Sequence, residues 1–131
     1  IFPYYCGIIT KKDLFENSLR TIRSLELDKP FPIRYTKIRQ KHKELRIPSF
    51  FAPNYEGTTV WIHLGLCFIQ VVKKYKPLLA KEYLQQYTRM FQKEKNFLEV
   101  FTKDAKPYSS FFYTSDESML WVSMYLYLKK K

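Results

Sequence analysis

The sequence is poor in the residues that build metal and redox centres. It contains two cysteines and two histidines, and Cys6 and Cys67 share no short spacing with each other or with a histidine. Zinc-finger and thiol redox motifs are therefore excluded. Both cysteines lie among apolar residues, which favours buried free thiols in a cytoplasmic protein over a disulfide. We expect neither a metal ion nor an organic cofactor.

The sequence also lacks a long apolar run. The apolar stretch from Ile1 to Ile9 is too short to cross a membrane and has no basic leader, so neither a membrane span nor a signal peptide is expected. Because the chain begins with Ile1 in place of Met, we interpret this stretch as a cut end that once followed more protein. The 131 residues have the size of one domain or part of one, and 46% hydrophobic content suffices for a packed core. We treat 1–131 as a single unit.

Acidic residues are scarce, at 12 against 23 lysines and arginines, which leaves a net charge of +11. Such a balance raises nucleic acid as a partner. Most of the excess is lysine spread over the faces of several predicted helices, however, so nucleic acid is not the expected partner. One dense basic run contains Arg34, Lys37, Arg39, Lys41, Lys43 and Arg46. We interpret it as a loop that faces solvent, with a polyanion-binding site as the alternative.

Apolar periodicity predicts helices in the first half of the chain. One covers about 11–25 and follows a capping-box pattern at 10–13. A second covers about 58–74, with Thr58 or Thr59 expected to cap its first free N–H groups. Its apolar residues recur at helical spacing, so we expect it to be buried along its length.

Two more helices are predicted in the second half. One covers about 77–93, and its short join to the preceding helix predicts an antiparallel αα-hairpin. The last begins at Thr114 or Ser115, where Asp116 and Glu117 would lie favourably against the helix dipole. It is apolar nearly all round, so we expect it to be buried between neighbours. The fold class is therefore all-α.

The segment 26–56 contains four prolines and no sustained periodicity. A loop of this length inside a compact domain is usually functional or disordered. Its apolar side chains favour a packed loop over a disordered one: Phe31, Ile33, Tyr35, Ile47, Phe50 and Phe51.

Aromatic and acidic side chains occur together in three connecting segments, 54–63, 97–104 and 114–121. In an all-helical toroid built of hairpins, such connections gather at one end and line one funnel. Sugar chemistry uses flat aromatic faces for stacking and carboxylates to move protons. The candidate faces are Tyr55, Trp61, Phe101 and Trp121, and the candidate carboxylates are Glu56, Glu99, Asp104, Asp116 and Glu117.

Several of these residues have a simpler structural interpretation. Trp61 and Trp121 stand at helical spacing, where tryptophan more often packs in a core. His63 lies one turn into an apolar helix, which favours a satisfied buried histidine, with a role in the site as the alternative. Asp116 and Glu117 would most simply stabilise a helix N-terminus.

Four stretches resemble one family and occur in its order. Phe2 to Ile8 resembles a Phe-Pro-Leu-x-x-Gly hairpin entry, and Asn54 to Trp61 resembles a Tyr-His-Asn-Gly-Gly-x-Trp-Pro stretch. Phe97 to Phe101 resembles a Trp-Pro-Glu-Tyr-Tyr segment, and Met119 to Leu126 is similar to a Gln-x-Trp-Ser-Ala-Ala-Met-Tyr-Leu helix. The family is that of the six-hairpin, (α/α)6-barrel glycosidases, which include neutral and alkaline invertases, glycogen-debranching glucosidases and mannosylglycerate hydrolases.

The resemblance implies that the chain is the C-terminal portion of an (α/α)6 toroid and needs the preceding helical hairpins as partners. It implies that Glu99 is the general base of an inverting glycoside hydrolysis, acting on an α-glucoside or related sugar. The family's general acid is an Asp on an earlier hairpin that this chain does not contain. The implied substrate-binding residues are Tyr55, Glu56, Trp61, His63, Phe101 and Trp121.

The sequence departs from the family at three places. Glu56 and Gly57 replace the His-Asn pair, Ile62 replaces the proline after the tryptophan, and the glycines after the base are missing. These departures leave two alternatives to hydrolysis. One is a degenerate toroid that binds sugar without cleaving it, and the other is a non-enzymatic helical module that binds a polyanion through 34–46.

Overall fold

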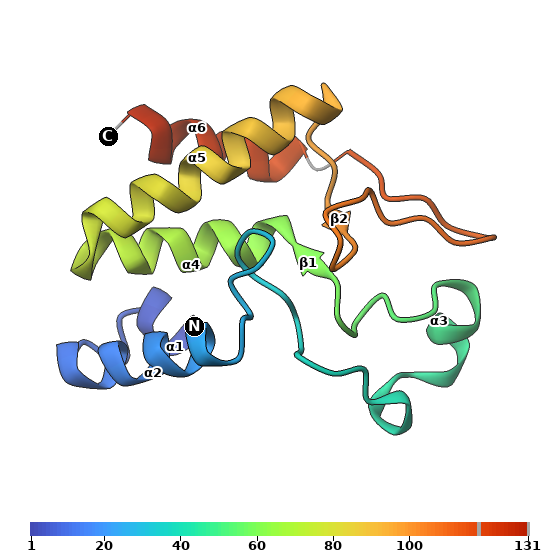
Figure 1. Cartoon of the computed structure of the whole chain (residues 1–131), viewed down its shortest axis with the longest axis horizontal. Helices are drawn as coiled ribbons and strands as arrows, with labels where there is room; N and C mark the ends of the chain where they lie inside the picture. Colours follow the sequence, from blue (N-terminus) through green and yellow to red (C-terminus); the bar gives the residue numbers. More distant parts are fainter. Residues whose placement is uncertain (118, 131) are drawn as a thin grey trace.

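The computed structural model describes residues 1–117 and 119–130, which are mostly helical (Figure 1). The four long helices expected from the sequence are present, so the all-α class is confirmed. Within the described residues the elements are α1 (Phe2–Tyr5), α2 (Lys12–Ser24), the 3-10 helix η1 (Lys41–Lys43), α3 (Arg46–Phe51), β1 (Val60–Trp61), α4 (Ile62–Tyr75), α5 (Pro77–Glu94), β2 (Val100–Phe101) and α6 (Met119–Lys130).

Helix α2 lies close to its predicted position, but the predicted capping box is wrong. Lys11 is the N-cap residue, and no side chain caps the first turn. Phe15 and Leu19 face the interior, and the Phe15 ring stacks on Tyr75 at the end of α4 with ring centroids 4.5 Å apart. The sequence pattern did not predict the single-turn helix α1. It packs against the same Phe15 ring, which Tyr4 contacts edge-on.

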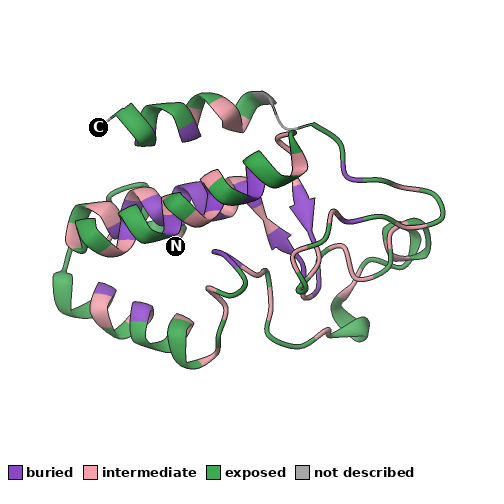
Figure 2. Cartoon of the chain, turned by 45° about the horizontal axis from the view of Figure 1, so that its top comes forward, coloured by how far each residue is buried: buried purple, intermediate pink, exposed green. Residues whose placement is uncertain are grey.

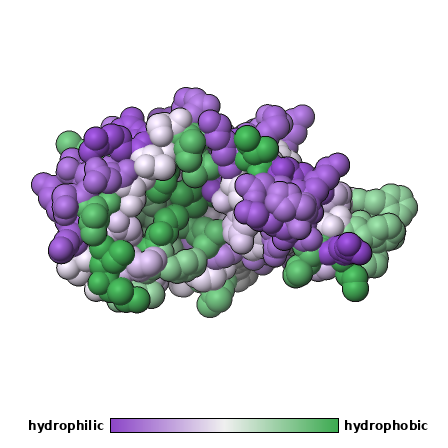
Figure 3. Space-filling model, turned by 90° about the horizontal axis from the view of Figure 1, so that it is seen from below, coloured by the Kyte–Doolittle hydropathy of each residue, from purple (hydrophilic) through white to green (hydrophobic). Residues whose placement is uncertain are grey.

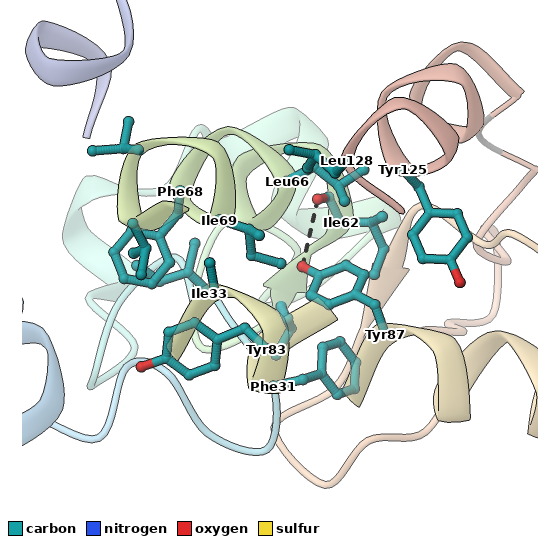
Figure 4. Packing of buried hydrophobic residues seen from close by; sticks show 14 of the residues in the cluster. Phe31, Ile33, Ile62, Leu66, Phe68, Ile69, Tyr83, Tyr87, Tyr125 and Leu128 are labelled. Carbon is teal, nitrogen blue, oxygen red and sulfur yellow. Dashed lines mark hydrogen bonds between the residues drawn. The ribbon is translucent and has the colours of Figure 1, made fainter. Parts of the chain in front are cut away.

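Helices α4 and α5 form the predicted antiparallel hairpin, joined only by Lys76 (Figure 1). Gly65 on α4 lets the two helices approach, because a Cβ there would collide with the Tyr87 hydroxyl and the Pro32 carbonyl. Tyr87 is fully buried and donates its hydroxyl proton to the carbonyl of Pro32, with that of Ile62 3.5 Å away. Figure 4 shows this phenol surrounded by the apolar core that both helices share.

Helix α4 begins at Ile62, so the predicted start near residue 58 is wrong. Val60 and Trp61 are extended and pair antiparallel with β2, placing Trp61 opposite Val100. Ladder hydrogen bonds hold this short segment more favourably than an extra helical turn would. The predicted threonine cap is consequently absent, since Trp61 is the N-cap residue and makes no side-chain cap bond.

Helix α6 also begins later than predicted, at Met119. The backbone before it is tied into isolated bridges, Ser109 with Thr114 and Leu98 with Glu117, so Asp116 and Glu117 do not occupy a first helical turn. The expectation that α6 is buried all round is wrong. Tyr125 and Leu128 are buried, whereas Leu120 is 75% exposed. Figure 2 shows α6 exposed along most of its outer side.

Only the beginning of the segment 26–56 enters the core. Phe31 and Ile33 are buried in the core, as expected. The later apolar residues lie on the segment 35–56, which projects from the helices and which we call the arm, and they are exposed: Tyr35, Ile47, Phe50 and Phe51. Phe50 and Phe51 still contact Phe112, so the expected packing is found there at the surface and not in the core. Figure 3 shows, from below, an apolar hollow on the helical side and more apolar atoms at the projecting end.

Candidate functional site

Glu99 is held by its backbone where three segments meet. Its carbonyl oxygen accepts a hydrogen bond of 3.0 Å from the N–H of Ile62, the first residue of α4. Its own N–H donates to the carbonyl oxygen of Asp116, also at 3.0 Å. The chain on either side is fixed as well, because the buried Ser115 hydroxyl accepts the N–H of Val100. The backbone of Glu99 is therefore fixed between α4 and the segment that leads into α6.

Tyr55 brings a phenol to this carboxylate from the loop before β1. The Tyr55 carbonyl accepts hydrogen bonds from the Trp61 indole N–H, at 3.0 Å, and from the Thr59 hydroxyl. The Tyr55 hydroxyl lies 3.4 Å from Oε2 of Glu99 and 3.2 Å from the hydroxyl of Tyr113. A phenol carries one proton, so when Tyr55 donates to Glu99 it accepts from Tyr113. The result is a short relay that ends on the carboxylate.

A row of aromatic rings continues from Tyr55 along the start of α4 and on to α6. Ring centroids are 4.7 Å apart between Tyr55 and Trp61, 5.2 Å between Trp61 and His63, and 4.9 Å between His63 and Trp121. All four side chains are partly exposed, so their faces are not sealed in the core. We call the following group the Glu99 cluster: Tyr55, Trp61, His63, Glu99, Tyr113 and Trp121.

Burial controls the ionisation of two members of the Glu99 cluster. Partial desolvation lowers the pKa of His63, while the negative charge of Glu99 acts in the opposite direction. His63 therefore favours the neutral imidazole, and its Nδ1 is buried without a hydrogen-bond partner among the described residues. Burial also raises the pKa of Tyr55, and the Tyr113 hydrogen bond and the Glu99 charge add to the effect. Tyr55 therefore remains a hydrogen-bond donor at neutral pH.

The structure brings together five of the seven residues named for the site in the sequence, namely Tyr55, Trp61, His63, Glu99 and Trp121. Phe101 does not join them. It is completely buried and packs edge-on against Phe31, because strand β2 runs directly into the core. Its ring cannot offer a face to a sugar in this structure.

The carboxylates of Glu56, Asp104, Asp116 and Glu117 do not belong to the Glu99 cluster. Glu56 is exposed and borders a hollow of about 210 Å³ together with Glu44 and Lys43 on the arm. Asp104 is exposed and pairs with its neighbour Lys103. Asp116 contributes only its backbone carbonyl to the position of Glu99, and its carboxylate accepts the N–H of the following residue.

Tyr113 was not predicted to belong to the site, but it shares a hydrogen bond and a ring contact with Tyr55. Tyr108, also not predicted, packs against Tyr55 and donates its hydroxyl proton to the Pro53 carbonyl at 2.8 Å. The segment that contains both is rich in serine and aromatic residues. The antiparallel bridge between Ser109 and Thr114, which aims these rings at the 52–58 loop, has no comparable signal.

Two arginines of the basic run 34–46 already interact with other groups of the chain. Arg39 forms a two-pronged ion pair with Glu44, with N–O distances of 2.7 and 2.8 Å. Arg34 donates to the backbone carbonyl of Glu26. The remaining cations of this run are exposed: Lys37, Lys41, Lys43 and Arg46.

Cys6 and Cys67 are both free thiols. Cys67 is buried as expected, but Cys6 is exposed because it follows the short surface helix α1. Within 1–117 and 119–130, no group of three or more His, Cys, Asp or Glu side chains is arranged to hold a metal ion. In the same residues, no helix has the length and apolar character required to span a membrane.

Comparisons with known proteins do not place the chain in a family. No family model matches the sequence, and neither a curated protein nor a solved structure matches it. The interpretation of the site therefore depends on its geometry and on the sequence resemblance.

Proposed function

We propose that this chain supplies the general base and part of the sugar pocket of an inverting glycoside hydrolase. The observation that carries the proposal is the position of the Glu99 carboxylate, hydrogen-bonded to Tyr55 at the edge of the row formed by Trp61, His63 and Trp121. Three connections that are distant in sequence meet there. A carboxylate beside flat ring faces suits a bound pyranose and the water that attacks it.

Five members of the Glu99 cluster have roles in this proposal. Glu99 takes the proton of the attacking water, and Tyr55 orients Oε2 so that the other carboxylate oxygen faces the reaction. Trp61 and Trp121 contact the apolar C–H face of the sugar. His63 stacks on Trp121 and holds its indole in position. Neither a metal ion nor an organic cofactor takes part.

The general acid would come from a hairpin that precedes this chain in an (α/α)6 toroid. Inversion requires two carboxyl groups about 6.5–9.5 Å apart, with the water between them. The exposed apolar side chains on α6 are consistent with further helices packing there. We place the enzyme in the cytoplasm, where the free thiols of Cys6 and Cys67 would persist, and we propose an α-glucoside or related sugar as the substrate.

The test is hydrolysis of an α-glucoside by the complete toroid, with this chain joined to the preceding hairpins. We expect Glu99→Gln to lower kcat by about 10²–10⁴-fold and to change KM little, because the base acts only in the transition state. The control is Asp104→Asn, which alters an exposed carboxylate in the same segment and should leave kcat nearly unchanged. Proton NMR should show the β-anomer as the first product.

Three results would contradict parts of this proposal. Undiminished kcat in the Glu99→Gln variant would remove Glu99 from the base role, and an α-anomeric first product would exclude inversion. Sugar binding without product release by the unaltered protein would identify a degenerate toroid that binds sugar only.

A second candidate function is polyanion binding through 34–46, favoured by the exposure of Lys37, Lys41, Lys43 and Arg46. Its signature is binding to nucleic acid that falls steeply with salt concentration. Such binding should be weakened by Lys41→Glu and unaffected by Glu99→Gln. The engagement of Arg34 and Arg39 by Glu26 and Glu44 reduces the cations available for it.

A further inference from the structure

A groove runs between α5 and the C-terminal half of α6, separate from the Glu99 cluster. It consists of two adjoining hollows of about 370 and 410 Å³ that share Lys81, Leu84 and Lys129. The first hollow extends to Pro77 and the second to Arg89. At about 1.5 Å per helical residue, these limits correspond to about 18 Å along α5. We call it the α5–α6 groove.

The α5–α6 groove has an apolar floor and a cationic rim. Its floor includes Leu84 and the buried Leu128, and its rim carries Lys73, Lys81, Arg89 and Lys129. Neither hollow is lined by an acidic residue.

The rim cations have little compensation from the described part of the chain. Lys73 donates to the backbone carbonyl of Leu128, and Lys129 lies over the Tyr125 ring. Among the described residues, no carboxylate lies within ion-pair distance of Lys81 or Arg89. The nearest acidic residues in sequence are Glu82, beside Lys81, and Glu94, five residues after Arg89, and Glu94 pairs with Lys93.

We propose that the α5–α6 groove binds an acidic amphipathic helix of a partner protein. A groove between two helices accepts the apolar face of a third, and about 18 Å accommodates about three helical turns. Glutamates or aspartates beside that apolar face would meet Lys81, Arg89 and Lys129, with favourable charge complementarity.

Other occupants fit the groove less well. A second copy of this chain would bring a net charge of +11 toward a basic rim. A fatty acid carries one carboxylate, which cannot reach cations distributed over about 18 Å. A bilayer surface is too flat to contact the floor between two helices. The proposal does not depend on the proposed hydrolase function, because none of these residues belongs to the Glu99 cluster.

The test uses this chain and a fluorescent synthetic peptide of about 12–14 residues, helical, with leucine on one face and glutamate beside it. Fluorescence anisotropy should show saturable binding. A peptide of the same composition in scrambled order, which has no apolar face, should bind about tenfold more weakly, as should one with glutamine in place of glutamate.

The site is tested with two variants of equal charge change. Lys81→Glu/Arg89→Glu/Lys129→Glu should weaken binding at least about tenfold, and the control Lys37→Glu/Lys41→Glu/Arg46→Glu should change it less than about threefold. NMR of the unaltered chain should place the largest shift changes on the methyl groups of Leu84 and Leu128, a result that does not require a variant to fold.

Equal losses in both variants, or equal affinity for the scrambled peptide, would show general attraction to a basic protein and overturn the proposal. NMR shift changes confined to 34–46 would overturn it as well, and would locate anion binding on the arm.

Discussion

His63 and Trp121 are stacked, with ring centroids 4.9 Å apart and 24° between the ring planes. This contact joins the start of α4 to the first turn of α6, and it brings Trp121 into the Glu99 cluster. The indole covers one face of the imidazole, which contributes to the desolvation that lowers the pKa of His63.

The lowered pKa of His63 predicts how stability varies with pH. The unfolded chain binds the histidine proton at about pH 6.5, whereas the folded chain binds it only at lower pH. Between these two values the unfolded state holds more protons, so the free energy of unfolding falls as pH drops below about 6.5. We expect lower stability at about pH 5.5 than at pH 7.5, measured by urea unfolding, and a smaller difference in His63→Phe.

The same pKa can be measured directly by NMR titration of the His63 ring protons. Trp121→Ala uncovers the imidazole, so it should raise the pKa toward the ordinary value. Leu120→Ala changes an exposed neighbour on α6 and should leave the pKa as it is. A Trp121→Ala variant with an unchanged His63 pKa would show that the stack does not cause the desolvation.

Gly65→Ala should destabilise the protein by about 1–3 kcal/mol, the usual cost of overpacking a close contact. The added methyl would collide with the Tyr87 hydroxyl and the Pro32 carbonyl. The measurement is the free energy of unfolding from urea denaturation.

Tyr87→Phe tests the cause, because it removes the hydroxyl and leaves only the Pro32 carbonyl group to collide with the added methyl. Tyr87→Phe alone loses a buried hydrogen bond, so Gly65→Ala/Tyr87→Phe should cost less than the sum of the single variants, by about 0.5 kcal/mol or more. Strict additivity would mean that Gly65 and Tyr87 do not constrain each other.

Ser115→Ala should lower the free energy of unfolding by about 1–3 kcal/mol, because the buried N–H of Val100 loses its hydrogen-bond acceptor. The same variant should loosen the backbone of Glu99, which amide hydrogen exchange at residues 99 and 100 would detect. Ser109→Ala, at an exposed position in the same segment, is the control and should have little effect. If the Val100 amide stays protected from hydrogen exchange in Ser115→Ala, the β1–β2 hydrogen bonds alone hold β2 in place.

Local sequence patterns were sufficient to predict the long helices. The ends of α5 and the antiparallel course of the α4–α5 hairpin follow from apolar spacing, Pro77 and the single-residue join, all of which act over a few residues. The sequence also indicated that Tyr55, Trp61 and Glu99 lie in connections, because polar loops there lead into apolar segments. Each of these signals depends on neighbours along the chain.

Tertiary structure decided where α4 and α6 begin and which rings meet Glu99. Val60 and Trp61 leave the helical pattern because residues 100 and 101 offer ladder hydrogen bonds from about forty positions away, a contact that local periodicity cannot express. The same pairing draws Phe101 into the core. Tyr113 reaches Tyr55 only because the 102–117 segment folds back on residues 98–101, through bridges from 107 to 101 and from 117 to 98. Tertiary packing therefore placed Tyr113 in the site, and no spacing along the sequence indicates it.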